Sequence, residues 1–207
     1  MQLTDVGDLL EYQSNPEIIR YIPWPPRSMD QVKAAAEKTI STGKFTLQED
    51  NDYIVLVWEL KSSGQVIGQS NMALVSKANK ASNIGWVTHQ DFHRQGYAFE
   101  ATKALLTYAF ANFDLHRVIA DIDSRVPESA ALAEKLGLRR EAEFKDGEFF
   151  KGEWCDMWLY AILNSELSAE YPRLKPTIKW GISHLSSVFR TIGTQLHSGI
   201  CFPHPWG

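Results

Sequence analysis

Residues 91–110, DFHRQGYAFEATKALLTYAF, place a short polar and basic turn directly before a long run of apolar and small residues. The run has the spacing of a helix, and the turn before it holds His93, Arg94, Gln95, Gly96 and Tyr97. A helix leaves the N–H groups of its first turn without partners, and its dipole favours a negative charge there. Glycine removes the Cβ that would block an anion, and arginine adds a charge-assisted contact. The pattern predicts a phosphate or diphosphate site.

Two common phosphate-binding motifs are absent from this turn. The Gly-Lys-Ser/Thr ending of a Walker loop is missing, and only one of the three glycines of a dinucleotide-binding fingerprint is present. A glycine turn with a purely structural role explains the same residues equally well. The interpretation therefore depends on the elements around the turn.

The chain before the turn is predicted to form two helices and then three strands. The helices are expected over 4–14, with Thr4 as N-cap, and over 28–40, with Ser28 as N-cap. The proline-rich stretch between them, SNPEIIRYIPWPP, is expected to be extended or turned. Three segments rich in β-branched and aromatic residues are expected to form an antiparallel meander, over 53–60, 66–76 and 83–89.

The chain after the turn is predicted to alternate between helices and strands. A helix is expected over 97–112, a strand over 116–123 and a second helix over 126–137. Two strands joined around 147–152 are expected within residues 141–163. The order of elements, ααβββαβαββ, is that of an α+β domain.

Residues 164–207 are expected to be an extension of the domain that residues 1–163 form. This stretch is net basic, whereas the rest of the chain is net acidic. Apolar residues from Ile178 to Leu196 fall at helical spacing, but threonine, serine and glycine fill the other face, so a weak amphipathic helix is predicted. Loose packing on the domain, contact with a partner or a membrane surface, and an end foreign to the domain remain open interpretations.

Composition excludes several classes of protein. The chain has 207 residues and a formal net charge of −4, without the basic character of a nucleic-acid-binding protein. No apolar run is long enough to span a membrane, and the first residues do not resemble a signal peptide. Cys155 and Cys201 lack metal-ligand spacing, and the histidines are too scattered for a metal site, so we expect a cytosolic protein without a metal.

Several segments in this order resemble the acyl-CoA N-acyltransferases of the GNAT superfamily, most closely the ribosomal-protein (RimJ/RimL-type) N-acetyltransferases. The resemblance covers about residues 3–163 and is carried by NPEIIRYIPWPP, IGWVTHQDFHRQGYAFEATKALLTYAF, LHRVIADID and ESAALAEKLGLRREAEFKDGEFFKGEWCDMWLYAIL. It implies a mixed, mostly antiparallel sheet flanked by helices, with acetyl-CoA as the cosubstrate. The sequence leaves open whether the protein is a monomer or a homodimer.

This sequence departs from the family pattern at three places. The family usually has a strand before its first helix, and here that strand is missing, so an exposed sheet edge is expected. His93 and Arg94 stand where the family turn usually has glutamine or arginine followed by glycine. Val126 stands where an asparagine often contacts the cofactor.

The resemblance also implies where the cosubstrate binds. In the family the third meander strand diverges from its parallel neighbour, here 116–123, and the pantetheine arm pairs with backbone in the gap. Trp86 and Val87 would supply that backbone, and an N–H near Val87 would polarise the thioester carbonyl. The diphosphate would lie over the backbone of Arg94, Gln95, Gly96, Tyr97 and Ala98.

Two side chains are the catalytic candidates. Glu148 falls where relatives carry a proposed catalytic glutamate, although Glu141 and Glu143 are alternative bases and a solvated hairpin acid is the structural alternative. Ser129 falls where that branch has a serine near the sulfur, and it would donate to the thiolate; the alternative is a serine that caps its helix. Many relatives use a tyrosine in this helix, and here Ala133 takes its place.

The acceptor is expected to be a protein N-terminal amine or a small-molecule amine. Tyr21, Trp24 and Trp154 are candidates to line its cleft, and core packing is the alternative for each of them. The predicted function is N-acetyl transfer from acetyl-CoA. A catalytically degenerate protein that binds or senses acyl-CoA without turnover is the second hypothesis.

Overall fold

The computed structural model describes residues 1–42, 45–170 and 189–195. Its helices are α1 (Val6–Gln13), α2 (Pro16–Ile19), α3 (Met29–Thr42), α4 (Tyr97–Asn112), α5 (Pro127–Lys135) and α6 (Asn164–Glu170), with 3-10 turns at Leu3–Asp5 and Gln90–Phe92. Its strands are β1 (Asp52–Glu59), β2 (Val66–Ser76), β3 (Ala81–Thr88), β4 (Arg117–Asp123), β5 (Arg139–Phe150), β6 (Glu153–Leu163) and β7 (Phe189–Gln195).

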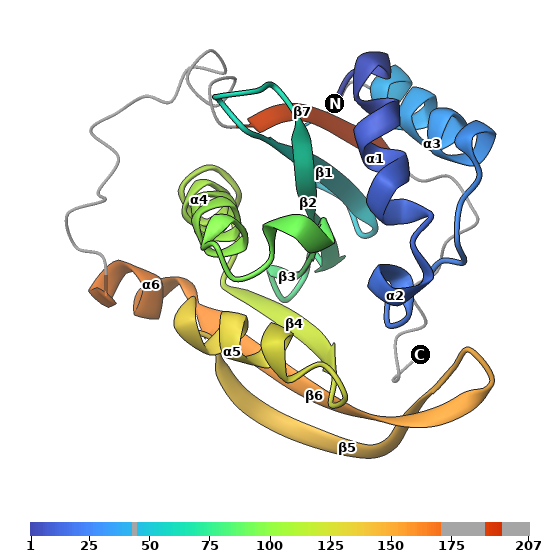
Figure 1. Ribbon diagram of the computed structural model, residues 1–207. Helices are drawn as coiled ribbons and strands as arrows, with labels where there is room; N and C mark the ends of the chain where they lie inside the picture. Colours follow the sequence, from blue (N-terminus) through green and yellow to red (C-terminus); the bar gives the residue numbers. More distant parts are fainter. Residues whose placement is uncertain (43–44, 171–188, 196–207) are drawn as a thin grey trace.

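The strands form one sheet in the order β5-β6-β4-β3-β2-β1-β7 (Figure 1). The pair of β3 with β4 is parallel, and the other described neighbours are antiparallel. This arrangement confirms the predicted α+β class, with a mixed and mostly antiparallel sheet flanked by helices. The predicted bounds of β2 and α4 agree with the structure at both ends.

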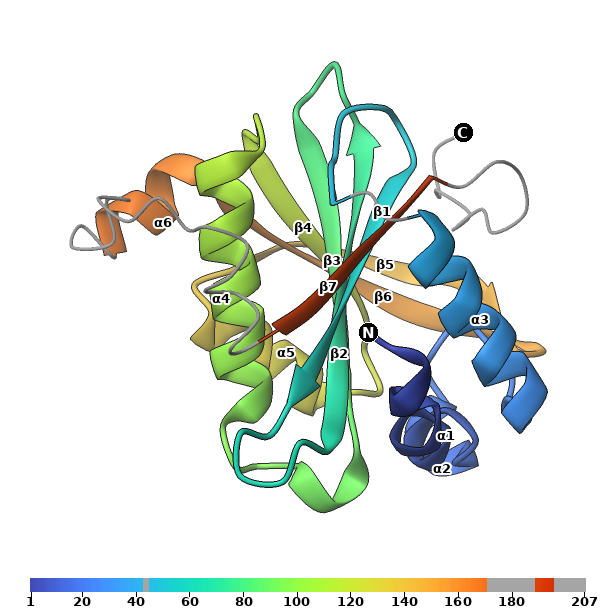
Figure 2. The same ribbon diagram turned by 90° about the horizontal axis from the view of Figure 1, so that it is seen from above.

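Alternating residues of the strands build two hydrophobic layers, one on each face of the sheet. Ile54 and Leu56 of β1 belong to the core under α4 and α5, whereas Val55 and Val57 belong to the core under α1 and α3. Figure 2 shows α4 and α5 on one side of the sheet and α1 to α3 on the other. Because β1 is apolar on both faces, the sequence shows a continuous apolar run there rather than strict alternation.

The parallel pair of β3 and β4 is short. Only three residue pairs join the two strands, Ala81 with Arg117, Ser82 with Val118 and Asn83 with Ile119. Beyond these pairs, residues 84–88 of β3 have no ladder with residues 120–123 of β4, and the strands diverge (Figure 1). The predicted separation of the third meander strand from residues 116–123 is therefore present.

The N-terminal region differs from the prediction in two details. The helix expected over 4–14 is a 3-10 turn followed by α1, whose N-cap is Asp5, so the assignment of Thr4 as the cap is wrong. The stretch expected to be extended contains α2, because the Asn15 side chain accepts from the Glu17 N–H and Pro16 fits the first turn. Ser28 does cap α3, since its hydroxyl accepts from the Gln31 N–H at 3.3 Å.

The sheet edge next to β1 is paired rather than exposed, contrary to the expectation. Strand β7 runs antiparallel to β1 over seven residue pairs, from Asp52 with Gln195 to Trp58 with Phe189. The helical spacing around Phe189 and Ile192 was therefore misleading, because these residues lie in a strand; the rest of the predicted C-terminal helix lies outside the described residues. The division at residue 163 stays a prediction.

Candidate functional site

Gly96 gives the start of α4 an open approach. It is the N-cap residue, with a φ of +88°, and Arg94 two residues earlier also has a positive φ of +60°. A Cβ added at Gly96 would meet no atom within 4 Å, so the space over this backbone is empty of protein. The first N–H groups of α4 have no intrahelical partner. This geometry suits an anion that approaches the helix end.

The side chains around Gly96 hold the turn in shape. The imidazole Nε2 of His93 lies 3.0 Å from the Thr88 carbonyl oxygen, and the Gln95 amide donates to the Asp91 carbonyl at 2.8 Å. These two side chains therefore bond to the backbone of their own loop, which leaves backbone rather than side chains to face a ligand. Within the described chain, the Arg94 guanidinium forms no ion pair, so it remains available to a phosphate.

His89 ties this loop to the first helix, a role that sequence reasoning missed. Its ring is 3% exposed, its Nε2 lies 3.0 Å from a carboxylate oxygen of Glu11, and its Nδ1 accepts from the Asp91 N–H. The two bonds fix the ring between α1 and the turn before α4. The sequence contained no signal for this, because Glu11 and His89 are far apart in the chain.

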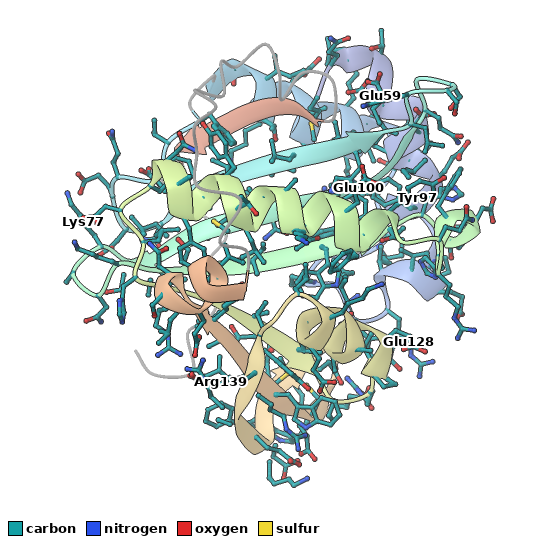
Figure 3. All side chains as sticks on the ribbon, turned by 90° about the vertical axis from the view of Figure 1, so that its left-hand side faces the viewer. Glu59, Lys77, Tyr97, Glu100, Glu128 and Arg139 are labelled. Atoms are coloured by element: carbon teal, nitrogen blue, oxygen red, sulfur yellow. The ribbon has the colours of Figure 1, made fainter. Side chains whose placement is uncertain are left out.

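A pocket of about 320 Å³ lies beside the start of α4. Tyr97 and Glu100 line it from α4, and Glu59 lines it from β1; Figure 3 shows these three side chains at the end of the molecule where α4 begins. Lys61 also lines the pocket, but the two carboxylates leave its lining with a net negative charge, which disfavours a diphosphate there. The open backbone at Gly96 is the better place for one.

Trp86 and Val87 lie in the part of β3 that has left β4. Trp86 packs against the core under α4, whereas Val87 is buried in the core under α1, as alternation along a strand requires. Their side chains therefore anchor β3 on both faces. The strand has no ladder to β4 at these residues, so the edge is open for an extended ligand.

Ser129 lies in the first turn of α5. Its N–H donates to the Val126 carbonyl at 3.1 Å, but its hydroxyl makes no hydrogen bond to any described residue. The helix has Val126 as N-cap, which provides no side-chain acceptor, and Pro127 follows. The Ser129 hydroxyl therefore does not cap its own helix, and it is available to a ligand.

Glu148 differs from the two alternative acids in its partners. Glu141 pairs with Arg117 and Arg139, and Glu143 pairs with Lys145 at 2.6 Å. Glu148 is half-buried and has no basic partner among the described residues.

The surroundings of Glu148 favour its protonated form. Burial raises the pKa of the Glu148 carboxyl, and the nearby charges of Asp121 and Asp123 raise it further. In contrast, the hydrogen bond and charge of Lys145 lower the pKa of Glu143. A carboxylate with a raised pKa is the better proton acceptor near neutral pH, which favours Glu148 as the base.

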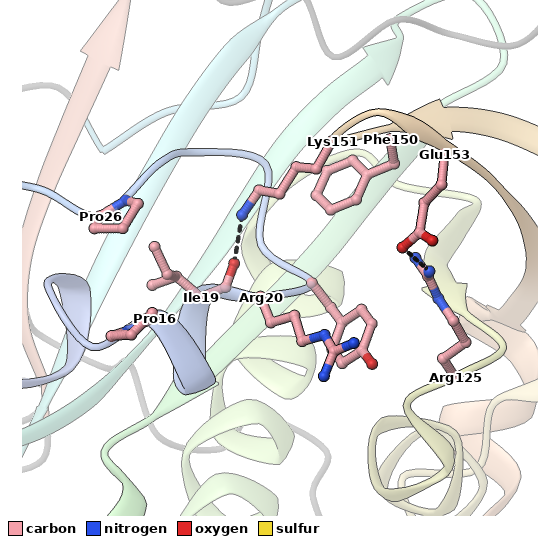
Figure 4. A pocket seen from close by; sticks show the side chains of 9 residues that line it. Pro16, Ile19, Arg20, Pro26, Arg125, Phe150, Lys151 and Glu153 are labelled. Atoms are coloured by element: carbon pink, nitrogen blue, oxygen red, sulfur yellow. Dashed lines mark hydrogen bonds and ion pairs between the residues drawn. The ribbon is translucent and has the colours of Figure 1, made fainter.

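A second pocket, of about 330 Å³, lies between α2 and the tip of the β5–β6 hairpin (Figure 4). Its lining comes from α2 and the loop after it, from the end of β4 and from the hairpin, namely Pro16, Ile19, Arg20, Tyr21, Pro26, Arg125, Phe150, Lys151 and Glu153. Arg125 lies two residues after β4, so the pocket adjoins the end of the sheet where β3 and β4 diverge.

The three aromatic acceptor candidates do not come together. Tyr21 lines the pocket between α2 and the hairpin. Trp24 stacks under the Arg27 guanidinium, 4.8 Å from it, and is not part of that lining. Trp154 is 62% exposed and packs edge-on against Phe149, on the opposite face of the hairpin from the pocket.

Lys151 and Arg125 shape this pocket, although no sequence pattern singles them out. The Lys151 ammonium donates to the carbonyl oxygens of Ile19, at 2.7 Å, and Trp24, at 3.2 Å, which ties the hairpin turn to the α2 loop. The Arg125 guanidinium binds both carboxylate oxygens of Asp123 and also contacts Glu153. The pocket wall is thus held by fixed polar contacts.

Two negative observations apply to the part of the chain that the structure describes. No group of three or more histidine, cysteine or acidic side chains there is arranged to hold a metal ion. None of the helices in those segments is both long and apolar enough to span a bilayer.

Comparison with known proteins gives consistent matches. The Acetyltransferase (GNAT) domain family matches residues 1–139, which include β3, the turn before α4 and Ser129. An uncharacterized N-acetyltransferase of Bacillus subtilis, YnaD, is 30% identical over 168 residues, covering 80% of this chain and 91% of that protein. The ribosomal protein uS5-alanine N-acetyltransferase of Escherichia coli is 28% identical over 99 residues, covering 47% of this chain and 51% of that protein.

A solved structure agrees with these sequence matches. The crystal structure of a GNAT-family acetyltransferase from Bacillus anthracis superposes with a TM-score of 0.71 at 27% identity. It covers 80% of this chain and 93% of that chain. The similarity therefore extends over nearly the whole of the other protein.

Proposed function

The chain belongs to the GNAT acetyltransferase family, and from this premise we propose how its own residues divide the work of acetyl transfer. It is an N-acetyltransferase that moves the acetyl group of acetyl-CoA to a primary amine. The observation that most supports our assignment of the site is the divergence of β3 from β4 next to the open first turn of α4.

We assign cosubstrate binding to two stretches of backbone. The N–H groups from Arg94 to Ala98 would hold the diphosphate, since Gly96 leaves the approach empty and the helix dipole favours negative charge. The free edge of β3 at Trp86 and Val87 would pair with the pantetheine arm as an added strand would. Neither stretch needs a metal ion.

Glu148 acts as the base in this assignment. The amine must be neutral to attack, and its lone pair forms the new C–N bond to the acetyl carbonyl carbon while its proton passes to Glu148, directly or through water. The ordinary pKa is about 7.7–8.0 for an α-amine and about 10.4 for a lysine side chain. Deprotonation at pH 7 therefore costs about 1 kcal/mol for an α-amine and about 4–5 kcal/mol for lysine, so an α-amine suits a modest base.

Ser129 completes the transfer by assisting the leaving group. The C–S bond breaks as the carbonyl re-forms, and the sulfur leaves as a thiolate. A hydroxyl without a protein partner can donate a hydrogen bond to that thiolate and so stabilise it. A backbone N–H of β3 near Val87 would stabilise the negative charge on the carbonyl oxygen.

The acceptor, the cellular compartment and the subunit arrangement are also part of the proposal. We assign the acceptor as a protein N-terminal amine or a small-molecule amine, and of the three aromatic candidates only Tyr21 lines the pocket proposed for it. Cysteine usage without a disulfide pattern favours the cytosol. The active unit is a monomer or a homodimer, which size-exclusion chromatography with light scattering would decide.

One assay tests the proposal against the acyl-CoA-sensing alternative. We would measure release of the CoA thiol from acetyl-CoA with a panel of peptides and small amines, and binding of acetyl-CoA by titration calorimetry. Saturable binding together with turnover is expected. Binding without turnover on any acceptor would favour the sensing protein, and absence of saturable binding would exclude both functions.

A further inference from the structure

Two guanidinium groups meet at one aromatic ring in the pocket between α2 and the hairpin. The Arg20 guanidinium carbon lies 5.4 Å from the centre of the Tyr21 ring, and that of Arg125 lies 5.0 Å from it. Figure 4 shows Arg20 and Arg125 facing the same space, with Glu153 beside Arg125. Such a convergence of positive charges needs compensation by negative charge.

The two arginines are compensated differently. Arg125 is paired with Asp123 and Glu153, so the charge of its guanidinium is balanced within the protein. Arg20 forms no ion pair with any described residue. Lys151 adds a third positive charge, and its ammonium is bound by carbonyl oxygens rather than by a carboxylate. Among the cations that line the pocket, Arg20 is therefore the group left to bind an anion.

This pocket opens on the same face of the hairpin as Glu148. Phe150 lines it and pairs with Glu153, and Glu148 pairs with Cys155 in the same ladder. Residues two apart in a strand point to the same side and lie about 7 Å apart, so Glu148 is one step along the strand from the pocket. An amine placed at Glu148 would thus have the rest of its molecule in the pocket.

We propose that this pocket binds a carboxylate of the acceptor, held by Arg20 with the Tyr21 hydroxyl, so that the preferred acceptor is a primary amine that also carries an acidic group. The inference rests on the proposed role of Glu148 at the amine. It excludes polyamines as preferred acceptors, because Arg20 and Lys151 would repel a second positive charge. A peptide with an acidic second residue and a small amino acid both have this chemistry.

The test compares matched acceptors that differ only in charge. One pair is a short peptide with aspartate or asparagine at its second position, and the other is 4-aminobutanoate and 4-aminobutanamide, with spermidine as the polycation. The wild-type protein should show a kcat/KM about fivefold higher for the acidic member of at least one pair, the size expected of an exposed ion pair. The pair that shows the preference identifies the source of the carboxylate.

Variants locate the preference in the pocket. Arg20→Gln should abolish it through KM with little change in kcat, because the contact is the same in the ground state and the transition state. Lys33→Gln, an equal loss of charge on the exposed side of α3, should leave it intact. Equal rates within both pairs, faster turnover of the amide or of spermidine, or a preference that survives Arg20→Gln would overturn the inference.

A binding measurement separates this inference from the proposed function. In the presence of CoA, the N-acetylated aspartate peptide should bind about fivefold more tightly than its asparagine counterpart, and Arg20→Gln should equalise the two. If no amine is turned over, the proposed function is wrong, and the calorimetric preference still decides whether the pocket binds a carboxylate. Equal affinities in the wild-type protein would reject the pocket even if amines are acetylated.

Discussion

Replacing Gly96 by glutamate should abolish acetyl-CoA binding while the fold survives. The substitution puts a carboxylate at the N-terminus of α4, over the backbone where we place the diphosphate. A Cβ at this position meets no atom within 4 Å, so no side chain has to move to admit it. The only steric penalty for the fold is the left-handed backbone, with its φ of +88°.

The effects on stability nearly cancel. A side chain in the left-handed region costs about 1–2 kcal/mol, and the stiffer unfolded chain returns about 0.4–1 kcal/mol. A carboxylate at a helix N-terminus returns a further 0.3–1 kcal/mol, roughly. The net loss is about 1 kcal/mol or less, which lowers the Tm by about 2–4 °C in a domain of this size. Binding loses up to about 2 kcal/mol of dipole attraction and gains repulsion, so Kd should rise about 30-fold or more.

Titration calorimetry with acetyl-CoA and a thermal melt measure the two effects separately. Gly152→Glu is the matched control, since Gly152 has a φ of +94°, also has no atom within 4 Å of an added Cβ, and lies in the turn between β5 and β6. It should keep the wild-type Kd with a similar change in Tm. If Gly96→Glu binds acetyl-CoA within a few-fold of the wild type, our interpretation of this turn is wrong.

Three further predictions concern the base, a close contact and the sheet edge. Glu148→Gln should lower kcat about 100-fold, whereas Glu141→Gln should not. Asp121→Asn removes a charge that raises the pKa of Glu148. Because a base acts when ionised, this variant should shift the acidic limb of the pH–rate profile to lower pH than in the wild type. Gly68→Ala should lower the Tm by about 4–8 °C, because its Cβ would lie 2.5 Å from Trp58 Cε3 and 2.6 Å from the Val87 carbonyl oxygen, while Gly7→Ala should not. Ending the chain at Glu170 removes β7 and exposes the edge of β1, so it should cause self-association that light scattering detects; a monodisperse truncated protein would contradict this.

The order and type of the main elements could be predicted because each has a strong local signal. The apolar runs of β1 and β2 and the glycine before α4 are features of neighbouring residues. Strand β7 could not be predicted in the same way, because its place depends on pairing with β1, more than a hundred residues earlier in the chain. Its apolar residues fit a helical period as well as a strand, and the tertiary pairing decides between them.

Candidate site residues can be selected from the sequence where a special backbone conformation must be encoded, and much less readily where distant side chains meet. Gly96 is visible because few other residues adopt its φ without strain. Arg20, Arg125 and Lys151 were not selected, because surface cations are common and only the fold brings these three to one pocket. Glu148 was already the first candidate by resemblance, and the structure adds a physical difference, since Glu143 pairs with Lys145 and Glu148 does not.

The two catalytic candidates approach the site from opposite faces of the sheet. Tyr160 of β6 donates to Glu134 of α5 at 3.0 Å, so the face of Tyr160 is the face of α5 and of Ser129.

Cys155 and Glu153, an odd number of positions away from Tyr160, point to the other face, where Glu148 and the pocket lie. In our proposal the acetyl group lies where β3 and β4 diverge, between the two faces. In that proposal the amine loses its proton to Glu148 on the α2 face, while Ser129 stabilises the thiolate on the α5 face. Neither residue can replace the other, and a change at Glu148 should alter acceptor activation without altering acetyl-CoA affinity.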